Sequence, residues 1–263
     1  MSEPTHLAII NAHPRDQYIT FDEGPHIYTV HGEMGYTSVT TLNHRHFSEF
    51  DSASIIAKIL SGSKWKNDPT YAYYKMSREQ IQAIWDANRD KAALAGTKLH
   101  YDVECYYNGI NVVNDSIEYK YFLEFVETFP HLKPYRTEWM VYYEELKLSG
   151  SIDMVFEKED GTLLIYDWKR VKEILYEPAF GNKFAITPCI SHLPDTNFWH
   201  YSLQLNTYKM ILEHKYGKKV VGLCLVCLHP DNCNKTFEVI DVPFLDNEMA
   251  NLVELRRREV AGL

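Results

Sequence analysis

Residues 150–170, GSIDMVFEKEDGTLLIYDWKR, constrain the fold more than any other stretch of this chain. Two apolar runs flank an Asp-Gly turn, which is a strong short-range signal for a β-hairpin. Centred on that turn, the pairing register places Val155 opposite Ile165 and Asp153 opposite Asp167. Opposed side chains on one face of an antiparallel pair have Cβ atoms roughly 4.5–5.5 Å apart. Two carboxylates therefore converge within apolar strands.

Such a pair of carboxylates needs a counter-charge, because like charges held this close repel each other. A hard divalent cation such as Mg²⁺ or Mn²⁺ fits, since it takes carboxylate and carbonyl oxygens as ligands. Lys169 lies two residues beyond Asp167 and points to the same face of the strand. Beside a metal, a lysine can orient water or stabilise charge on a phosphate. The hairpin alone leaves a plainer interpretation open, in which these are edge-strand residues facing water and Lys169 offsets Asp167.

The short pattern acidic-x-Lys has little weight alone, because the chain contains it four times: Glu118 to Lys120, Glu145 to Lys147, Asp167 to Lys169 and Glu213 to Lys215. The third copy differs because it lies on an apolar strand and has a partner aspartate on the preceding strand.

Two helical segments present further pairs of polar residues. In GTKLHYDVE, His100 and Glu104 are four residues apart and share one helix face. In QLNTY, Gln204 and Tyr208 have the same spacing, with His200 one turn earlier. Each pair taken alone is more typical of a surface or capping arrangement than of a site.

Length and composition predict one large domain, because 263 residues with 45% hydrophobic content can bury a sizeable core. We expect a single domain over 1–263, with an N-terminal β element at 1–50, a helical wall at 51–134 and a core at 135–263.

Hydrophobic periodicity and turn residues predict the secondary structure. Strands are expected at 18–21, 26–30, 36–42, 135–145, 148–157, 162–169, 219–229 and 236–242. Helices are expected at 51–61, at 77–96 with a capping box at Ser77 and Gln80, and at 97–109, 115–129, 198–215 and 246–259. Residues 176–197 lack periodicity and are expected to form a long loop of the kind that is often functional.

The overall charge and the cysteine count bear on nucleic-acid binding and on the redox state of the thiols. A formal net charge of −9 argues against coating nucleic acid by bulk electrostatics, but it allows a site that gathers carboxylates around divalent cations. Without a long apolar run or a leader-like N-terminus, we expect no membrane partner and a soluble intracellular protein of undetermined compartment. Five cysteines are an odd count that fits reduced thiols.

Residues 64–75, KWKNDPTYAYYK, interleave lysines with aromatic residues. Such a segment can stack bases and contact phosphates. A solvated loop with aromatic side chains packed inward is the commoner arrangement, and both interpretations stay open.

In chain order, the motifs GTxxH-xxx-E, G-S-I-D, D-W-K and Q-xxx-Y resemble the RecB-like branch of the PD-(D/E)XK nuclease superfamily. The YTSVTTL segment, and the D-W-K motif followed by a Q-xxx-Y helix, are similar to the mitochondrial genome maintenance exonuclease and to related viral and phage nucleases. The resemblance covers roughly residues 26–258. No single motif is specific, but the ordered set is.

The resemblance implies a role for each matching residue. Metal ligands would be His100, Asp153, Asp167 and the backbone carbonyl of Trp168, with Glu104 as a second-metal or orienting carboxylate. Lys169 would be the catalytic lysine, and Gln204 and Tyr208 would position the scissile strand or support Lys169. Glu138 stands where many relatives carry a glutamate and would be a further ligand.

The resemblance also implies the fold and the activity. We expect an α/β fold with a restriction-endonuclease-like core, in which a central mixed β-sheet is flanked by helices and accompanied by a small N-terminal β element. The expected function is Mg²⁺- or Mn²⁺-dependent hydrolysis of DNA, by an exonuclease acting on single strands or ends in replication, repair or recombination. A protein partner that delivers the substrate is compatible with the acidic chain. Two alternatives remain: a catalytically silent nucleic-acid-binding or assembly protein on the same fold, and an RNA-directed nuclease.

The chain departs from the family pattern at two places. Ile152 replaces the proline before Asp153. Arg170 follows Lys169 where relatives often carry Thr or Ser, so we do not carry over the family's phosphate contact at this position. Cys224, Cys227 and Cys233 resemble part of an iron-sulfur cluster motif, but we expect no cluster. Cys224 and Cys227 lie on opposite faces of an apolar strand, and the upstream cysteine that the motif requires before the His100 helix is absent.

Overall fold

A computed structural model describes residues 3–178, 181 and 183–263 of the chain. The chain divides into two compact units. The larger comprises Met1–Ser48 and Leu99–Leu263, and the smaller comprises Glu49–Lys98. The single domain expected over 1–263 stays a prediction.

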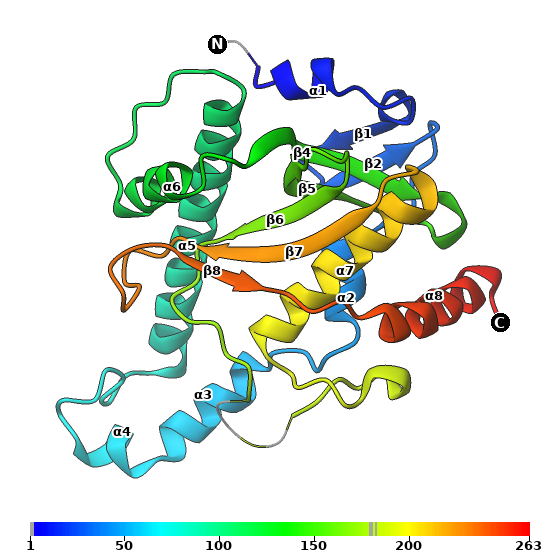
Figure 1. Cartoon of the computed structure of the whole chain (residues 1–263). Helices are drawn as coiled ribbons and strands as arrows, with labels where there is room; N and C mark the ends of the chain where they lie inside the picture. The colour runs from blue at the N-terminus through cyan, green and yellow to red at the C-terminus, as the bar shows by residue number, and fades with distance from the viewer. Residues whose placement is uncertain (1–2, 179–180, 182) are drawn as a thin grey trace. The chain divides into compact units, whose positions relative to one another are not determined.

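The larger unit is built around a mixed β-sheet, which confirms the expected α/β fold (Figure 1). Within the described residues the strands run in the order β3-β5-β6-β7-β8, and β4 pairs with β5. Neighbours β5 and β6 are antiparallel, whereas β6 and β7 are parallel. The strand bounds are Thr37–Ser38 (β3), Lys133–Tyr143 (β4), Leu148–Glu157 (β5), Leu163–Lys169 (β6), Val220–Cys227 (β7) and Glu238–Asp241 (β8). A separate hairpin of β1 (Ile19–Asp22) and β2 (Ile27–Val30) forms the small N-terminal β element.

Helices cover both faces of this sheet, because alternate side chains of each strand point to opposite faces. On one face, Met154, Phe156 and Trp168 pack with residues of α5 (Arg78–Tyr107) and α6 (Ile117–Thr128). On the other face, Val155 and Ile165 pack with residues of α7 (Asn197–Lys215), in a cluster that also includes residues of α2 (Val39–His44) and α8 (Asp246–Ala261). The sheet is therefore buried on two sides.

The smaller unit consists of α3 (Ser52–Ser61), α4 (Ser63–Asn67) and the first part of α5. The predicted capping box at its long helix is confirmed: the Gln80 amide donates to Ser77 Oγ, and the Ser77 amide donates to Gln80 Oε1. Asp51 caps α3 by accepting from the Ser54 amide. Local side-chain chemistry thus sets where both helices begin.

The short elements are α1 (His6–Ile10) and three 3₁₀ turns at Asp16–Tyr18, Glu144–Leu146 and Pro188–Ile190. The predicted loop at 176–197 contains the last of these turns and a bridge between Phe184 and Pro194. Residues 179, 180 and 182 of that loop lie outside the described residues. No helix in the described part of the chain has the length and apolarity needed to span a bilayer.

Two secondary-structure predictions are wrong, whereas the other predicted bounds agree to within about two residues. The strand expected at 36–42 ends at Ser38, because the Ser38 side chain accepts from the Thr41 amide and starts α2. The helices expected at 77–96 and 97–109 are one helix, α5. A glycine ends a helix when it adopts a left-handed conformation. Gly109 does so, with φ +74°, whereas Gly96 is not among the residues of positive φ.

Because Gly96 continues a helix and an added Cβ would meet no atom within 4 Å, Gly96→Ala should raise the free energy of unfolding by about 0.5–1 kcal/mol. Urea unfolding monitored by circular dichroism measures this change. A decrease in stability would contradict the continuous helix, because alanine is strained only where a helix ends in a left-handed residue.

Candidate functional site

The candidate site lies where the sheet forks. One edge of β5 pairs with β4 at residues 148–152 and 154–157, which leaves out Asp153. The other edge pairs with β3 at residues 148–149 and with β6 at residues 154–157. On that second edge, residues 150–153 have no strand neighbour within the described chain. This leaves room at the fork for side chains.

The predicted register of the hairpin is confirmed, since Val155 pairs with Ile165 and the ladder extends to Met154 and Tyr166. Asp153 and Asp167 come one rung further, beyond the last paired residues of the two strands. There Asp153 Oδ2 accepts a hydrogen bond from the Trp168 amide at 3.1 Å instead. The strands thus separate at the rung that holds the two aspartates.

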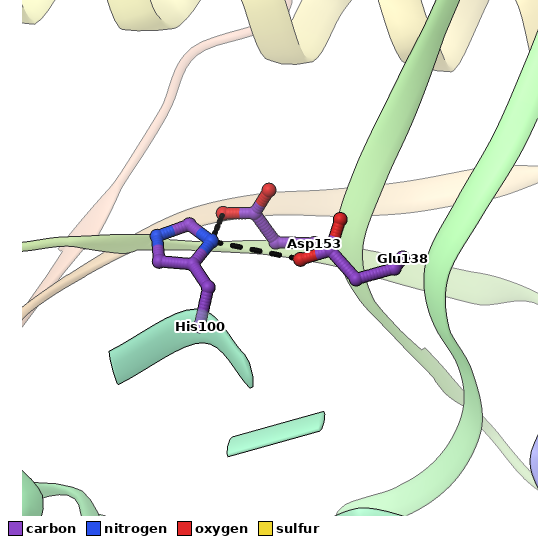
Figure 2. Close-up of side chains that lie close together, drawn as sticks. All are labelled: His100, Glu138 and Asp153. Carbon is purple, nitrogen blue, oxygen red and sulfur yellow. Dashed lines mark ion pairs between the residues drawn. The ribbon is translucent and has the colours of Figure 1, made fainter. Parts of the chain in front are cut away.

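His100, Glu138 and Asp153 converge at the fork from three different elements (Figure 2). His100 Nδ1 lies 3.6 Å from Glu138 Oε1 and 3.5 Å from Asp153 Oδ2. One atom from each of the three residues can be chosen so that all lie within 4.8 Å of one another. The other ring nitrogen, Nε2, is 2.9 Å from the Trp168 carbonyl oxygen. The two carboxylates therefore face Nδ1 of the imidazole, whereas the Trp168 carbonyl faces Nε2 on the other side of the ring.

Glu138 reaches this cluster from a strained backbone. Its φ is +41° although it lies inside β4, and residues with a side chain rarely adopt such an angle, at a cost of about 1–3 kcal/mol. The Ser151 hydroxyl donates to Glu138 Oε2 at 2.9 Å and fixes the carboxylate. Strain of this kind persists where the surrounding structure over-determines it, and it is concentrated at functional sites.

Asp167 and Lys169 form an ion pair at 2.6 Å beside the cluster. Asp167 is only 2% exposed, and burial raises the pKa of its carboxyl to about 6 although Lys169 acts in the opposite direction. Burial lowers the pKa of Lys169, but Asp167 and Asp153 outweigh it and the net change is upward. Lys169 Nζ also lies 4.4 Å from the centroid of the Tyr201 ring. The lysine is a buried ammonium group held between a carboxylate and an aromatic face.

Charges in the cluster shift the pKa values of its other members. Burial lowers the pKa of His100, but Asp153 and Glu138 outweigh this and bring it to about 9. Burial, and secondarily Glu138, raises the pKa of Glu104 to about 7. Burial also raises the pKa of Asp153 although His100 opposes it. In this state the imidazolium of His100 partly offsets a concentration of negative charge.

Gln204 and Tyr208 lie on α7, on the opposite face of the sheet from α6. Tyr208 is buried and packs against the backbone of Gly150, where an added Cβ would lie 2.9 Å from the phenol oxygen. Gln204 forms a hydrogen bond with Tyr208 and lines a cavity together with Lys169. Residue 150, in the G-S-I-D motif, is therefore a glycine because Tyr208 of the Q-xxx-Y motif leaves no space for a side chain.

All nine residues singled out in the sequence lie in the larger unit. One group contains His100, Glu138, Asp153 and the Trp168 carbonyl, a second contains Asp167 and Lys169, and a third contains Gln204 and Tyr208. The ninth residue, Glu104, is near enough to Glu138 for its pKa to be raised by it, but Glu104 is not one of the three residues that converge. The cluster includes Glu138 directly, whereas Asp167, expected as a ligand, is paired with Lys169. The resemblance had implied the reverse, with Asp167 as a main metal ligand and Glu138 only as a further one.

Sequence reasoning missed Tyr201, the aromatic neighbour of Lys169. Tyr201 precedes Gln204 by three residues on α7, so helical spacing alone could have placed it on the same face. Asn43, which lines the same cavity, carried no signal because its proximity comes from long-range packing of α2.

The aromatic residues of 64–75 pack within their own unit. Trp65 Nε1 donates to the Met76 carbonyl, and Trp85 Nε1 donates to the Tyr73 hydroxyl. Tyr71 contacts Tyr73 edge to face, and the tyrosines are partly buried. Of the two interpretations of this segment, the structure favours inward packing.

The two cysteines of the C-x-x-C pattern occupy opposite faces of β7, as the strand period requires. Cys224 packs with Trp168 and Val226, and Cys227 packs in the cluster on the α7 face. Burial raises the pKa of each thiol to about 12.

No protein-family model matches the chain, and a search of curated proteins found no match. The resemblance to the RecB-like nucleases therefore rests on the ordered motifs and stays a prediction.

The contact between Gly150 and Tyr208 generates a prediction for the fork. Gly150→Ala should lower the free energy of unfolding by about 1–3 kcal/mol, because the new methyl group overlaps the Tyr208 ring. Urea unfolding of Gly150→Ala, Tyr208→Ala and the double variant measures the coupling. The double variant should be more stable than the sum of the single changes predicts. Strict additivity would contradict the close approach.

Proposed function

We propose that the chain is a metal-dependent nuclease that hydrolyses phosphodiester bonds of DNA, as an exonuclease on single strands or ends. The observation that carries this proposal is the convergence of His100, Glu138, Asp153 and the Trp168 carbonyl at the fork, next to the pair of Asp167 and Lys169. Nuclease chemistry uses this combination, since a carboxylate-rich metal site and an ammonium group together serve a negatively charged substrate.

The donor set fits a divalent cation. Glu138, Asp153 and Asp167 bring three carboxylates together, and Lys169 balances one of them. A divalent ion balances the other two with His100 as neutral imidazole, which is the form that binds metals. Carboxylate and carbonyl oxygens suit Mg²⁺ and Mn²⁺, and Mn²⁺ also accepts imidazole nitrogen. His100, Glu138 and Asp153 would hold the ion, and the Trp168 carbonyl, expected as a ligand, would instead orient the imidazole by accepting from Nε2–H.

When bound, the ion would supply Lewis-acid polarisation of the phosphate and lower the pKa of a ligating water. Lys169 would donate hydrogen bonds to a non-bridging oxygen of the reacting phosphate and stabilise the charge that develops there. Its ion pair with Asp167 keeps it charged, so it acts as a donor rather than as a base. Tyr208 and Gln204 act as positioning residues, Tyr208 through Gly150 and Gln204 beside Lys169.

DNA is the proposed substrate because the resemblance is to DNA nucleases. The chain carries an overall negative charge, so affinity for nucleic acid must come from local contacts and the metal, or from a protein partner that delivers the substrate. Competition by single-stranded RNA distinguishes DNA from RNA as the substrate.

Cleavage of labelled DNA tests this function. Single-stranded and duplex DNA, labelled at the 5′ or the 3′ end, should be shortened with Mg²⁺ or Mn²⁺ and remain intact with EDTA. Asp167→Asn should lower the rate by at least about 100-fold, whereas Asp160→Asn in the exposed turn of the hairpin should not change it. Cleavage that persists at the wild-type rate in Asp167→Asn would contradict the assignment.

Metal binding and cleavage should separate in two variants. Glu138→Gln should weaken Mn²⁺ binding about tenfold or more by calorimetry, because it removes a charged ligand, and the exposed Glu159→Gln serves as the matched control. Lys169→Ala should retain Mn²⁺ binding and lose cleavage. Circular dichroism verifies folding, because Asp167 then lacks its partner. Unchanged affinity in Glu138→Gln would remove this glutamate from the site.

A further inference from the structure

A cavity of about 350 Å³ lies beside Lys169 in the larger unit. It is lined by residues of α2, the end of β6 and α7: Thr40, Asn43, His44, Lys169, His200, Tyr201 and Gln204. Each of these side chains carries a polar group able to donate a hydrogen bond, and none is a carboxylate. In a chain of net charge −9, a cavity lined in this way is suited to an anion.

Asn43 gives this cavity an unsatisfied donor. Its side chain is only 3% exposed, and its Nδ2 has no hydrogen-bond partner among the described residues. A buried donor without a partner destabilises the folded state, because it has lost its hydrogen bonds to water. An acceptor oxygen in the cavity would remove that destabilisation.

His200 is held rigidly on the wall of the cavity. Its Nε2 lies 2.9 Å from Asp195 Oδ1, and its ring packs on Phe47 with the centroids 3.9 Å apart. The ring of His44 lies 6.1 Å from that of His200. Two acidic residues contact lining residues without lining the cavity themselves. Asp195 is paired with His200, and Asp167 is paired with Lys169.

We propose that this cavity binds a phosphate group of the substrate strand, next to the phosphate at which hydrolysis occurs. This inference rests on the proposed nuclease function, because Lys169 is the residue that the cavity shares with the candidate site. Thr40, His44 and Asn43 would donate to phosphate oxygens from α2, while Gln204 approaches from α7 and Lys169 from the end of β6. The cavity thereby fixes the strand relative to Lys169.

The chemistry of the walls excludes other occupants. A cation would meet Lys169 and no carboxylate, and an apolar ligand would leave the buried Asn43 Nδ2 without an acceptor. A phosphate oxyanion accepts from hydroxyl, amide, imidazole and ammonium donors together. The phosphate belongs either to a strand terminus or to an internal diester, and the substrates below separate these two sources.

Thr40→Asp is the decisive variant. Thr40 is exposed in the first turn of α2, where an acidic residue suits the helix, so the change adds a carboxylate to the cavity without disturbing folding. His44→Ala removes an exposed donor, and His6→Ala is the matched control because His6 is an exposed histidine of α1. Circular dichroism verifies the fold of each.

Binding is measured on the full chain in EDTA with deoxythymidine 5′-monophosphate, inorganic phosphate and uncharged thymidine, by calorimetry and by the imidazole NMR signals of His44 and His200. Both phosphate compounds should bind and shift these signals, whereas thymidine should not. Thr40→Asp should weaken phosphate binding at least tenfold, His44→Ala several-fold, and His6→Ala not at all. Undetectable phosphate binding, or equal affinity in Thr40→Asp, overturns the proposal.

Cleavage of 5′-phosphorylated and 5′-hydroxyl strands then identifies the source. A rise in KM in Thr40→Asp confined to the phosphorylated strand assigns the cavity to a terminal phosphate, and an equal rise on both strands assigns it to an internal diester. An unchanged KM on both overturns the inference while leaving the nuclease function intact. A wild-type protein that binds phosphate but cleaves nothing instead overturns the nuclease function alone.

Discussion

The concentration of carboxylates at the fork of the sheet is the constraint on which the rest of the site depends. Asp153 and Asp167 lie on central strands, and Glu138 reaches the same place from β4. Charged groups in such surroundings are costly unless they are paired. His100 and Lys169 supply the pairing in this structure. The raised pKa values of Asp153 and Asp167 show that burial is not fully offset.

Several local features follow from that constraint. The strands β5 and β6 separate where the two aspartates would otherwise oppose each other, and the Trp168 amide takes up one carboxylate oxygen. Glu138 has a strained backbone with a positive φ. At residue 150 a glycine leaves space for Tyr208. A plain structural core has no use for these features together. They fit the site for a cation and a phosphate that we propose.

The sequence was most informative where local rules decide the structure. The Asp-Gly turn and the alternation of apolar residues determine the hairpin register, and the capping box determines where α5 begins. The helix end predicted at Gly96 was wrong, because the sequence does not show whether a glycine adopts the left-handed backbone conformation. The helix ends at Gly109 instead.

The candidate site was only partly predictable, because its residues come from distant parts of the chain. His100 and Lys169 belong to local motifs that the sequence shows. Glu138 reaches the cluster through an unusual backbone angle, which no motif encodes. Asn43 and Tyr201 meet Lys169 only after α2 and α7 pack on the sheet. Long-range packing of this kind has no short-range sequence pattern.

The most direct test of the central claim is anomalous diffraction from crystals of the protein grown with Mn²⁺. The account predicts a Mn²⁺ peak between His100 Nδ1, Glu138 and Asp153, with oxygen ligands at about 2.0–2.6 Å. Crystals that show no peak there, or a peak only at surface carboxylates, would contradict the metal-dependent chemistry proposed for this fork.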